Sequence, residues 1–290
     1  MPRVSEQISC ENPKVSVKMI TYNHEPFIAQ AIESVLMQET DFPVELIIGE
    51  DYSPDGTREI VKRYAAKYPN VIRALLPERN LGIRANSAGV SKACRGQYIA
   101  FLEGDDYWTS PHKIKKQVDF LDTHLNYSAS AHQTKQLLED GTPGKIFGQF
   151  DKLDVGVVDT IAPLSPWHTT SFVCRREFFY LPDWISSIIS VDMAIFTIVA
   201  SRGPVRVFPE VMSVYRKHVG GITSDAKVIA NFHQNRIELM EHLDDHLKYE
   251  YHDRFQEVIH SHRAAIRAAK SRWFYQLASQ AKKKLRSLLK

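Results

Sequence analysis

Residues 98–108 read Tyr-Ile-Ala-Phe-Leu-Glu-Gly-Asp-Asp-Tyr-Trp. The first five are rich in large apolar residues, and so short a run is typical of a buried strand in an α/β sheet, with Gly104 permitting a sharp turn after it. Glu103, Asp105 and Asp106 then lie at the carboxyl end of that strand, the edge where open α/β sheets bind ligands. Crowded carboxylates repel one another unless a cation such as Mg²⁺ or Mn²⁺ joins them. A solvated acidic turn is the structural alternative.

Strands and helices alternate on both sides of this stretch. Such alternation predicts a doubly wound, Rossmann-like α/β sheet flanked by helices. The expected strands are Val15–Ile20, Val44–Ile48, Val71–Leu76 and Tyr98–Leu102, and the expected helices are Ile28–Leu36, Thr57–Tyr68, Ile83–Ala93 and one opened by Pro111.

The periodicity weakens between Asn126 and Pro166, where only short strands are expected. Beyond it, Ser190 is expected to cap a helix that runs to about Ser201, and the pattern after Ser224 is helical. We therefore predict a domain over residues 1–225 and a C-terminal helical extension over 226–290. The short strands expected in this half are Tyr127–Ala131, Lys145–Phe150, Thr169–Cys174, Val205–Phe208 and Val211–Tyr215.

The composition predicts a cytoplasmic protein. Its three cysteines lie far apart and form no CxxC pair, so neither a disulfide framework nor a zinc site is indicated. The first twelve residues are polar and predict no signal peptide. The apolar window Trp184–Ala200 contains Asp192, a charge that is costly in lipid, so we expect it in the protein core.

The charge is concentrated at the C-terminus. Residues 258–290 contain nine Lys or Arg and no acid, although the whole chain carries only +3. Trp273, Leu277 and Leu285 recur at helical spacing, which predicts a basic amphipathic helix over residues 270–290. Such a helix could bind the anionic inner leaflet peripherally, or pack on its own domain or a partner chain. It fits nucleic acid less well.

Six motifs in order give the chain a family resemblance. Over residues 14–224 it resembles the family 2 inverting glycosyltransferases of the GT-A fold. The motifs are Thr21-Tyr-Asn23, Glu50–Thr57, Asn80-Leu-Gly82, Glu103–Trp108, Asp192 with its apolar helix, and Tyr215–His218.

The resemblance implies that the loops after the first strands hold a nucleotide. Asp51 could accept a hydrogen bond from N3–H of a uracil or thymine ring, and Tyr22 offers an aromatic face. Asp51 could instead cap a helix. Arg84 could contact a phosphate or could simply be exposed to solvent. The implied nucleotide-binding residues are Thr21, Tyr22, Asn23, Glu25, Asp51, Gly82, Arg84 and Asp105.

The same resemblance implies a divalent cation, Mn²⁺ or Mg²⁺, and a catalytic base. The family's pattern places metal coordination at Asp106, with Asp105 contacting ribose or sharing the metal, and His218 as a further ligand or an exposed side chain. Asp192 is the implied base, in the first turn of a helix whose dipole keeps it ionised. Alternatively, Asp192 could serve only to complement the partial positive charge at the N-terminus of that helix.

The acceptor side is implied at Trp167, His168 and Thr170, although Trp167 could equally be core. Arg272-Trp273 resembles part of a processive-synthase signature, but Ala269 stands where that signature has Gln, which favours single addition. The predicted function is transfer of one sugar, with inversion, from a nucleoside-diphosphate donor to a hydroxyl of a glycan or lipid-linked saccharide, and we expect the donor to be UDP-linked. A sugar-nucleotide pyrophosphorylase and a non-catalytic nucleotide- or glycan-binding module are the alternatives.

Overall fold

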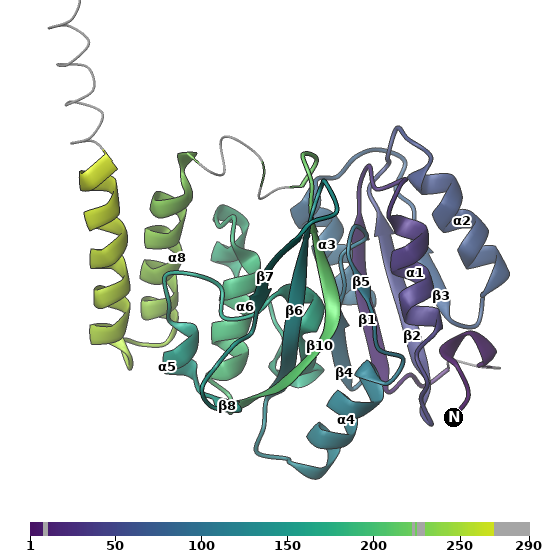
Figure 1. Ribbon diagram of the computed structural model, residues 1–290, viewed down its shortest axis with the longest axis horizontal. Coiled ribbons are helices and arrows are strands. Elements are labelled where there is room, and N and C mark those ends of the chain that lie inside the picture. The colour runs from purple at the N-terminus through teal and green to yellow at the C-terminus, as the bar shows by residue number, and fades with distance from the viewer. Residues whose placement is uncertain (8–10, 222–223, 225–229, 270–290) are drawn as a thin grey trace, which may run out of the picture.

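The computed structural model describes residues 1–7, 11–221, 224 and 230–269. It contains a ten-stranded mixed sheet with helices on both faces, followed by two C-terminal helices (Figure 1). The predicted fold class is therefore confirmed. Among the described residues, no helix is both long and apolar enough to cross a membrane. The predicted basic helix over 270–290 lies outside the described residues, so its membrane binding stays a prediction.

The N-terminal half of the sheet is parallel, in the order β3-β2-β1-β4. Its strands run in one direction because a helix crosses back after each of the first three. The carboxyl ends of all four strands therefore meet at one edge (Figure 1). The elements are β1 (Val15–Thr21), α1 (Ile28–Leu36), β2 (Val44–Glu50), α2 (Thr57–Lys67), β3 (Ile72–Leu75), α3 (Ile83–Ala93) and β4 (Tyr98–Phe101).

The C-terminal half is mixed and continues in the order β4-β9-β6-β10-β5, with β7 attached to β6 and β8 to β10. The short β9 runs antiparallel to both β4 and β6, so it joins the two halves. The long strands β6 and β10 are parallel. These strands are β5 (Tyr107–Trp108), β6 (Ala129–Leu138), β7 (Pro143–Phe147), β8 (Asp154–Val155), β9 (Val173–Arg175) and β10 (Val205–Lys217).

Several predicted elements of this half are wrong in detail. The strand expected at residues 127–131 is the start of the longer β6, and β7 ends at Phe147 instead of Phe150. Thr169–Ser171 is a 3-10 turn, and the strand follows it. The two strands expected at 205–215 are one strand whose register shifts between Phe208 and Ser213. Ser190 precedes its helix without a side-chain capping bond.

Hydrophobic residues fill both faces of the sheet. On β2, Leu46 and Ile48 pack toward α1, α2 and α4 (Lys113–Thr123), whereas Ile47 faces α3 and α6 (Val191–Ala200). The second face also takes α5 (Val157–Thr160), α8 (Phe232–His246) and the helical residues 252–269, which contribute Leu243 and Phe255. The C-terminal helices thus share a core with the sheet, and the boundary at residue 225 stays a prediction.

Candidate active site

The loops that carry the predicted site residues gather at the carboxyl edge of the parallel strands. They follow β1, β2, β3 and β4, and the end of β10 joins them. The backbone of Gly104 approaches Thr21 so closely that a Cβ on residue 104 would lie 2.6 Å from the Thr21 side chain. Glycine is therefore required for the acidic turn to lie against the β1 loop.

Asp51 anchors the loop after β3. Its Oδ1 accepts a hydrogen bond from the amide of Leu81 at 2.7 Å, and its Oδ2 accepts one from Gly82 at 2.9 Å. Gly82 has a φ of +82°, a backbone conformation that favours glycine. Asn80 closes the loop by donating to the backbone carbonyl of Asp51 at 3.0 Å. Asp51 therefore has a structural role, and its predicted contact with a base would use its remaining lone pairs.

The loop after β1 is fixed by the loop after β2. The amide of Asn23 donates to Ser53 at 3.0 Å, and Glu25 accepts from the amide of Gly56 at 2.8 Å. Tyr22 is 44% exposed at the rim, whereas the hydroxyl of Thr21 is buried without a hydrogen-bond partner among the described residues. The predicted nucleotide-binding loop is thus held in one conformation.

Arg84 lies at the start of α3 and donates to the carbonyl of Ile188 at 3.3 Å. It links the loop after β3 to the loop that leads into α6, so the structure gives it a partner other than solvent. Its predicted contact with a phosphate stays a prediction.

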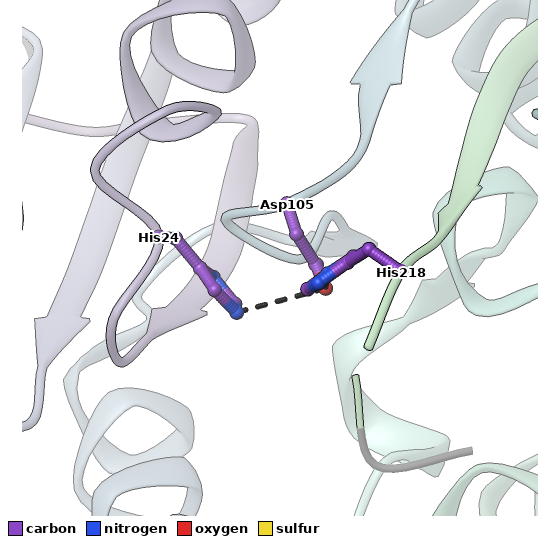
Figure 2. A group of neighbouring side chains, drawn as sticks. All are labelled: His24, Asp105 and His218. Carbon is purple, nitrogen blue, oxygen red and sulfur yellow. Dashed lines mark hydrogen bonds and ion pairs between the residues drawn. The ribbon is translucent and has the colours of Figure 1, made fainter. Parts of the chain in front are cut away.

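His24, Asp105 and His218 form a compact group of potential metal ligands (Figure 2). Nε2 of His218 lies 3.1 Å from Oδ2 of Asp105, and Nε2 of His24 lies 3.6 Å from the same oxygen. One ligand atom from each residue lies within 4.8 Å of the others. Two imidazoles and a carboxylate on three separate loops could hold one divalent cation.

The charges within this group influence one another. Burial opposes ionisation of Asp105, but the hydrogen bond from His218 and the nearby His24 outweigh it and hold the pKa of Asp105 below its ordinary value. Burial lowers the pKa of His24. The ionised carboxylate and the neutral imidazole are the forms of these side chains that bind metals.

Asp106 is buried beside the His24–Asp105–His218 group. Its Oδ1 accepts a hydrogen bond from the backbone amide of Arg216 at 2.8 Å, and its Oδ2 lies 3.8 Å from Nδ1 of His168. Burial and the charge of Asp105 raise the pKa of Asp106 well above its ordinary value. The group of three potential ligands contains His24 and does not include Asp106, whose predicted coordination of a metal stays a prediction.

Asp192 lies in the first turn of α6, as predicted, and is electrostatically coupled to two neighbours. Loss of hydration raises the pKa of Glu103 to about 7, and the charges of Asp105 and Asp192 add to this. Burial lowers the pKa of Arg236, and the charge of Asp192 opposes that lowering.

The three predicted acceptor residues differ in exposure. Trp167 is fully buried, with its ring 5.2 Å from that of Phe196 on α6 and 5.7 Å from that of Phe172. Thr170 is also fully buried and bonds Ser213 through its hydroxyl at 2.9 Å. Only His168 reaches the surface, with 17% of its side chain exposed. Contact with an acceptor stays a prediction, and for Trp167 the structure favours the alternative of core packing.

His24 is the one member of the ligand group that the sequence analysis missed. The position of His24 along the chain could have indicated it. His24 lies in the loop after β1, and β1 is the direct neighbour of β4 in the sheet. A histidine at the carboxyl end of one strand beside an acidic turn at the end of the next is close enough to share a ligand with it.

The chain is similar to known proteins in both sequence and fold. Residues 16–147 match the family model described as Glycosyl transferase family 2. The uncharacterized protein Rv1520 of Mycobacterium tuberculosis is 37% identical over 212 residues, which are 73% of this chain. The chain spans about three fifths, 61%, of that relative's length.

Two solved structures share the fold. TarS of S. aureus, in complex with UDP-GlcNAc, gives a TM-score of 0.62 at 22% identity, covering 80% of this chain and 66% of the TarS chain. Mannosyltransferase PcManGT of Pyrobaculum calidifontis, in complex with GDP-Man and Mn²⁺, gives 0.55 at 18% identity, covering 98% of this chain and 83% of its own. At these identities the likeness establishes the fold alone.

Proposed function

Residues 16–147 match the glycosyl transferase family 2 model, and from that premise we propose that the chain belongs to this family and moves a single sugar, with inversion, from a UDP-linked donor to a hydroxyl of a glycan or lipid-linked saccharide. The observation that carries the proposal is the position of the His24–Asp105–His218 group at the same sheet edge as Asp51. The UDP-GlcNAc bound to TarS supports the choice of a UDP-linked donor.

The residues present fit a divalent metal. Asp105 supplies a carboxylate and the two histidines supply imidazole nitrogens, a mixed set that suits Mn²⁺ better than Mg²⁺ because Mg²⁺ prefers oxygen ligands alone. The Mn²⁺ in the PcManGT complex is consistent with this choice. When bound, the metal would neutralise the charge that develops on the departing diphosphate.

Asp192 is the proposed base. It would take the proton of the acceptor hydroxyl as that oxygen attacks the anomeric carbon from the face opposite the diphosphate. It lies in the first turn of α6, at a helix N-terminus, which carries partial positive charge. The nearby Arg236 adds a second positive charge.

Donor turnover tests this proposal. Hydrolysis of UDP-GlcNAc, GDP-Man and a dTDP-sugar would be measured with Mn²⁺, with Mg²⁺ and without metal, for the wild type and for Asp192→Asn. We expect Asp192→Asn to lower turnover by about 10²- to 10⁴-fold while UDP affinity stays near the wild-type value. Asp119→Asn is the matched control, because Asp119 is an exposed aspartate on α4. Equal turnover in the two variants would contradict the assignment of Asp192.

The metal ligands have a separate test. Calorimetric titration with Mn²⁺ in the presence of UDP should show about 10- to 100-fold weaker binding in Asp105→Asn and in His24→Ala than in the wild type. Asp119→Asn should bind Mn²⁺ as the wild type does. Unchanged Mn²⁺ affinity in both ligand variants would contradict the proposed site, whatever the turnover.

A further inference from the structure

Three aromatic rings from distant segments meet beside Asp106. Phe147 lies at the end of β7, His168 precedes the 3-10 turn 169–171, and Tyr215 lies near the end of β10. The rings of His168 and Tyr215 stack with centroids 4.2 Å apart, and Phe147 packs edge-on against them at 5.5 and 5.9 Å. All three side chains are partly exposed. We call this group the aromatic platform.

The platform adjoins the acidic turn that follows β4. Nδ1 of His168 is 3.8 Å from Oδ2 of Asp106 in that turn. The adjacent Trp167 packs in the core against Phe196 of α6, the helix that carries Asp192 in its first turn. A molecule resting on these rings would therefore lie beside the acidic turn.

Lys145 stands at the rim of the platform. Side chains of a strand alternate between its two faces, so Lys145 and Phe147 share one face of β7 while Ile146 faces the other way. The Nζ of Lys145 is 4.4 Å from the centroid of Phe147, and its charge contributes to lowering the pKa of His168. Lys145 is exposed and makes no ion pair with any described carboxylate. The platform thus carries a cation that is available to a ligand.

We infer that the aromatic platform binds a sugar ring of the acceptor and that Lys145 binds a negative charge on that acceptor, so the acceptor is an anionic glycan. This inference rests on the proposed function. Partly exposed aromatic faces suit the apolar face of a pyranose, and an unpaired lysine at their rim suits a carboxylate or a phosphate. Uronic acids and sugar phosphates both supply this chemistry.

Binding of three small probes would test the inference and separate these two sources. The probes are methyl β-D-glucopyranoside, methyl β-D-glucopyranosiduronate and methyl β-D-glucopyranoside 6-phosphate, each titrated by saturation-transfer NMR at low salt with UDP and Mn²⁺ present. We expect at least one anionic probe to bind the wild type about two- to fivefold more tightly than the neutral one. The stronger anionic probe identifies the source of the charge.

Variants separate the charge from the ring. Lys145→Gln should abolish the preference for the anionic probes. Lys135→Gln should keep it, because Lys135 is an exposed lysine on the paired strand β6, opposite Ile146 instead of Phe147. Phe147→Ala should weaken all three probes about three- to tenfold, and Phe147→Tyr, which keeps the ring, should restore binding.

The inference would be overturned if the wild type bound the three probes with equal affinity, or bound none of them. It would also be overturned if Lys145→Gln and Lys135→Gln lost the preference for anionic probes to the same extent. UDP binding measured in the same samples keeps the two proposals apart. If UDP binds and the probes do not discriminate, only the acceptor inference fails. If UDP does not bind, the proposed function itself fails.

Discussion

The two halves of the sheet hold their buried polar groups in different ways. In the N-terminal half, the buried Glu45 accepts hydrogen bonds from Ser16 at 2.6 Å and from the Arg95 guanidinium at 2.7 Å. In the C-terminal half, Lys113 and His132 are completely buried, yet Nζ of Lys113 and Nε2 of His132 have no hydrogen-bond partner among the described residues. Burial holds the pKa of both groups well below the ordinary values.

The two halves of the sheet are therefore stabilised by different means. Paired charges keep the half that carries Asp51 and the β1 loop in one arrangement. The half that carries the aromatic platform instead buries a lysine and a histidine whose pKa values are lowered by that burial. This lowers stability wherever the unfolded chain binds protons that the folded chain does not. The first half should therefore be more sensitive to loss of a partner, and the second to pH.

The largest effect is expected from Glu45→Ala. It leaves the buried hydroxyl of Ser16 without its acceptor and removes one of the two acceptors of the Arg95 backbone amide. The guanidinium of Arg95 can turn to water because half of that side chain is exposed. We expect a loss of about 2–3 kcal/mol in the free energy of unfolding, measured by urea denaturation. Glu59→Ala, which removes only an exposed ion pair with Lys62, is the control and should be neutral. A neutral Glu45→Ala would remove the contrast between the halves.

Lys113→Met is expected to act in the opposite direction. Methionine keeps the length of the side chain, and the Lys113 amine lies 4.1 Å from the centroid of Trp108 without a described hydrogen-bond partner. Removing a buried polar head in such a place should raise the free energy of unfolding by about 1–3 kcal/mol. Lys115 forms ion pairs with the exposed Asp41 and Asp119, so Lys115→Met is a control that should not raise the free energy of unfolding. A loss of stability in Lys113→Met would reveal a partner for its amine.

His132 should give the smallest effect, as a dependence on pH. Its pKa is lowered in the folded protein, so below pH 6.5 the unfolded chain binds a proton that the folded chain does not. Stability should therefore fall with decreasing pH, by at most about 1.4 kcal/mol per pH unit from this residue. Urea denaturation at pH 7, 6 and 5 should show a steeper decline for the wild type than for His132→Asn. Parallel declines would show that His132 does not titrate in this range.

The same contrast explains which elements could be predicted. Strands β1, β2 and β4 are apolar runs that stop at polar turns, so their sequence indicates both that they are strands and where each strand begins and ends. In β6, the inward positions include His132 and Thr134. The hydroxyl of Thr134 forms a hydrogen bond with that of Ser213, 2.9 Å away on β10. Because the partner lies almost eighty residues away, no local pattern reveals that this polar strand is buried.

The candidate site divides in a similar way. Asp105 and His218 could be found because each follows a strand and the motif series placed both. The position of Asp106 depends on the backbone amide of Arg216, and that of Trp167 depends on Phe172 and Phe196, contacts that only the folded chain creates. Residue type and order along the chain indicate which loops converge, but not which side chain of a loop turns inward.

The attachment of β7 has a consequence for engineering. This strand lies off the main path of the sheet and pairs with β6, whereas Asp105, His24 and His218 follow β4, β1 and β10. The hairpin that brings Lys145 and Phe147 to the platform could therefore be exchanged for another of the same register while the metal ligands keep their scaffold. Libraries confined to residues 139–147 would be a compact way to redirect such a catalyst toward new saccharides.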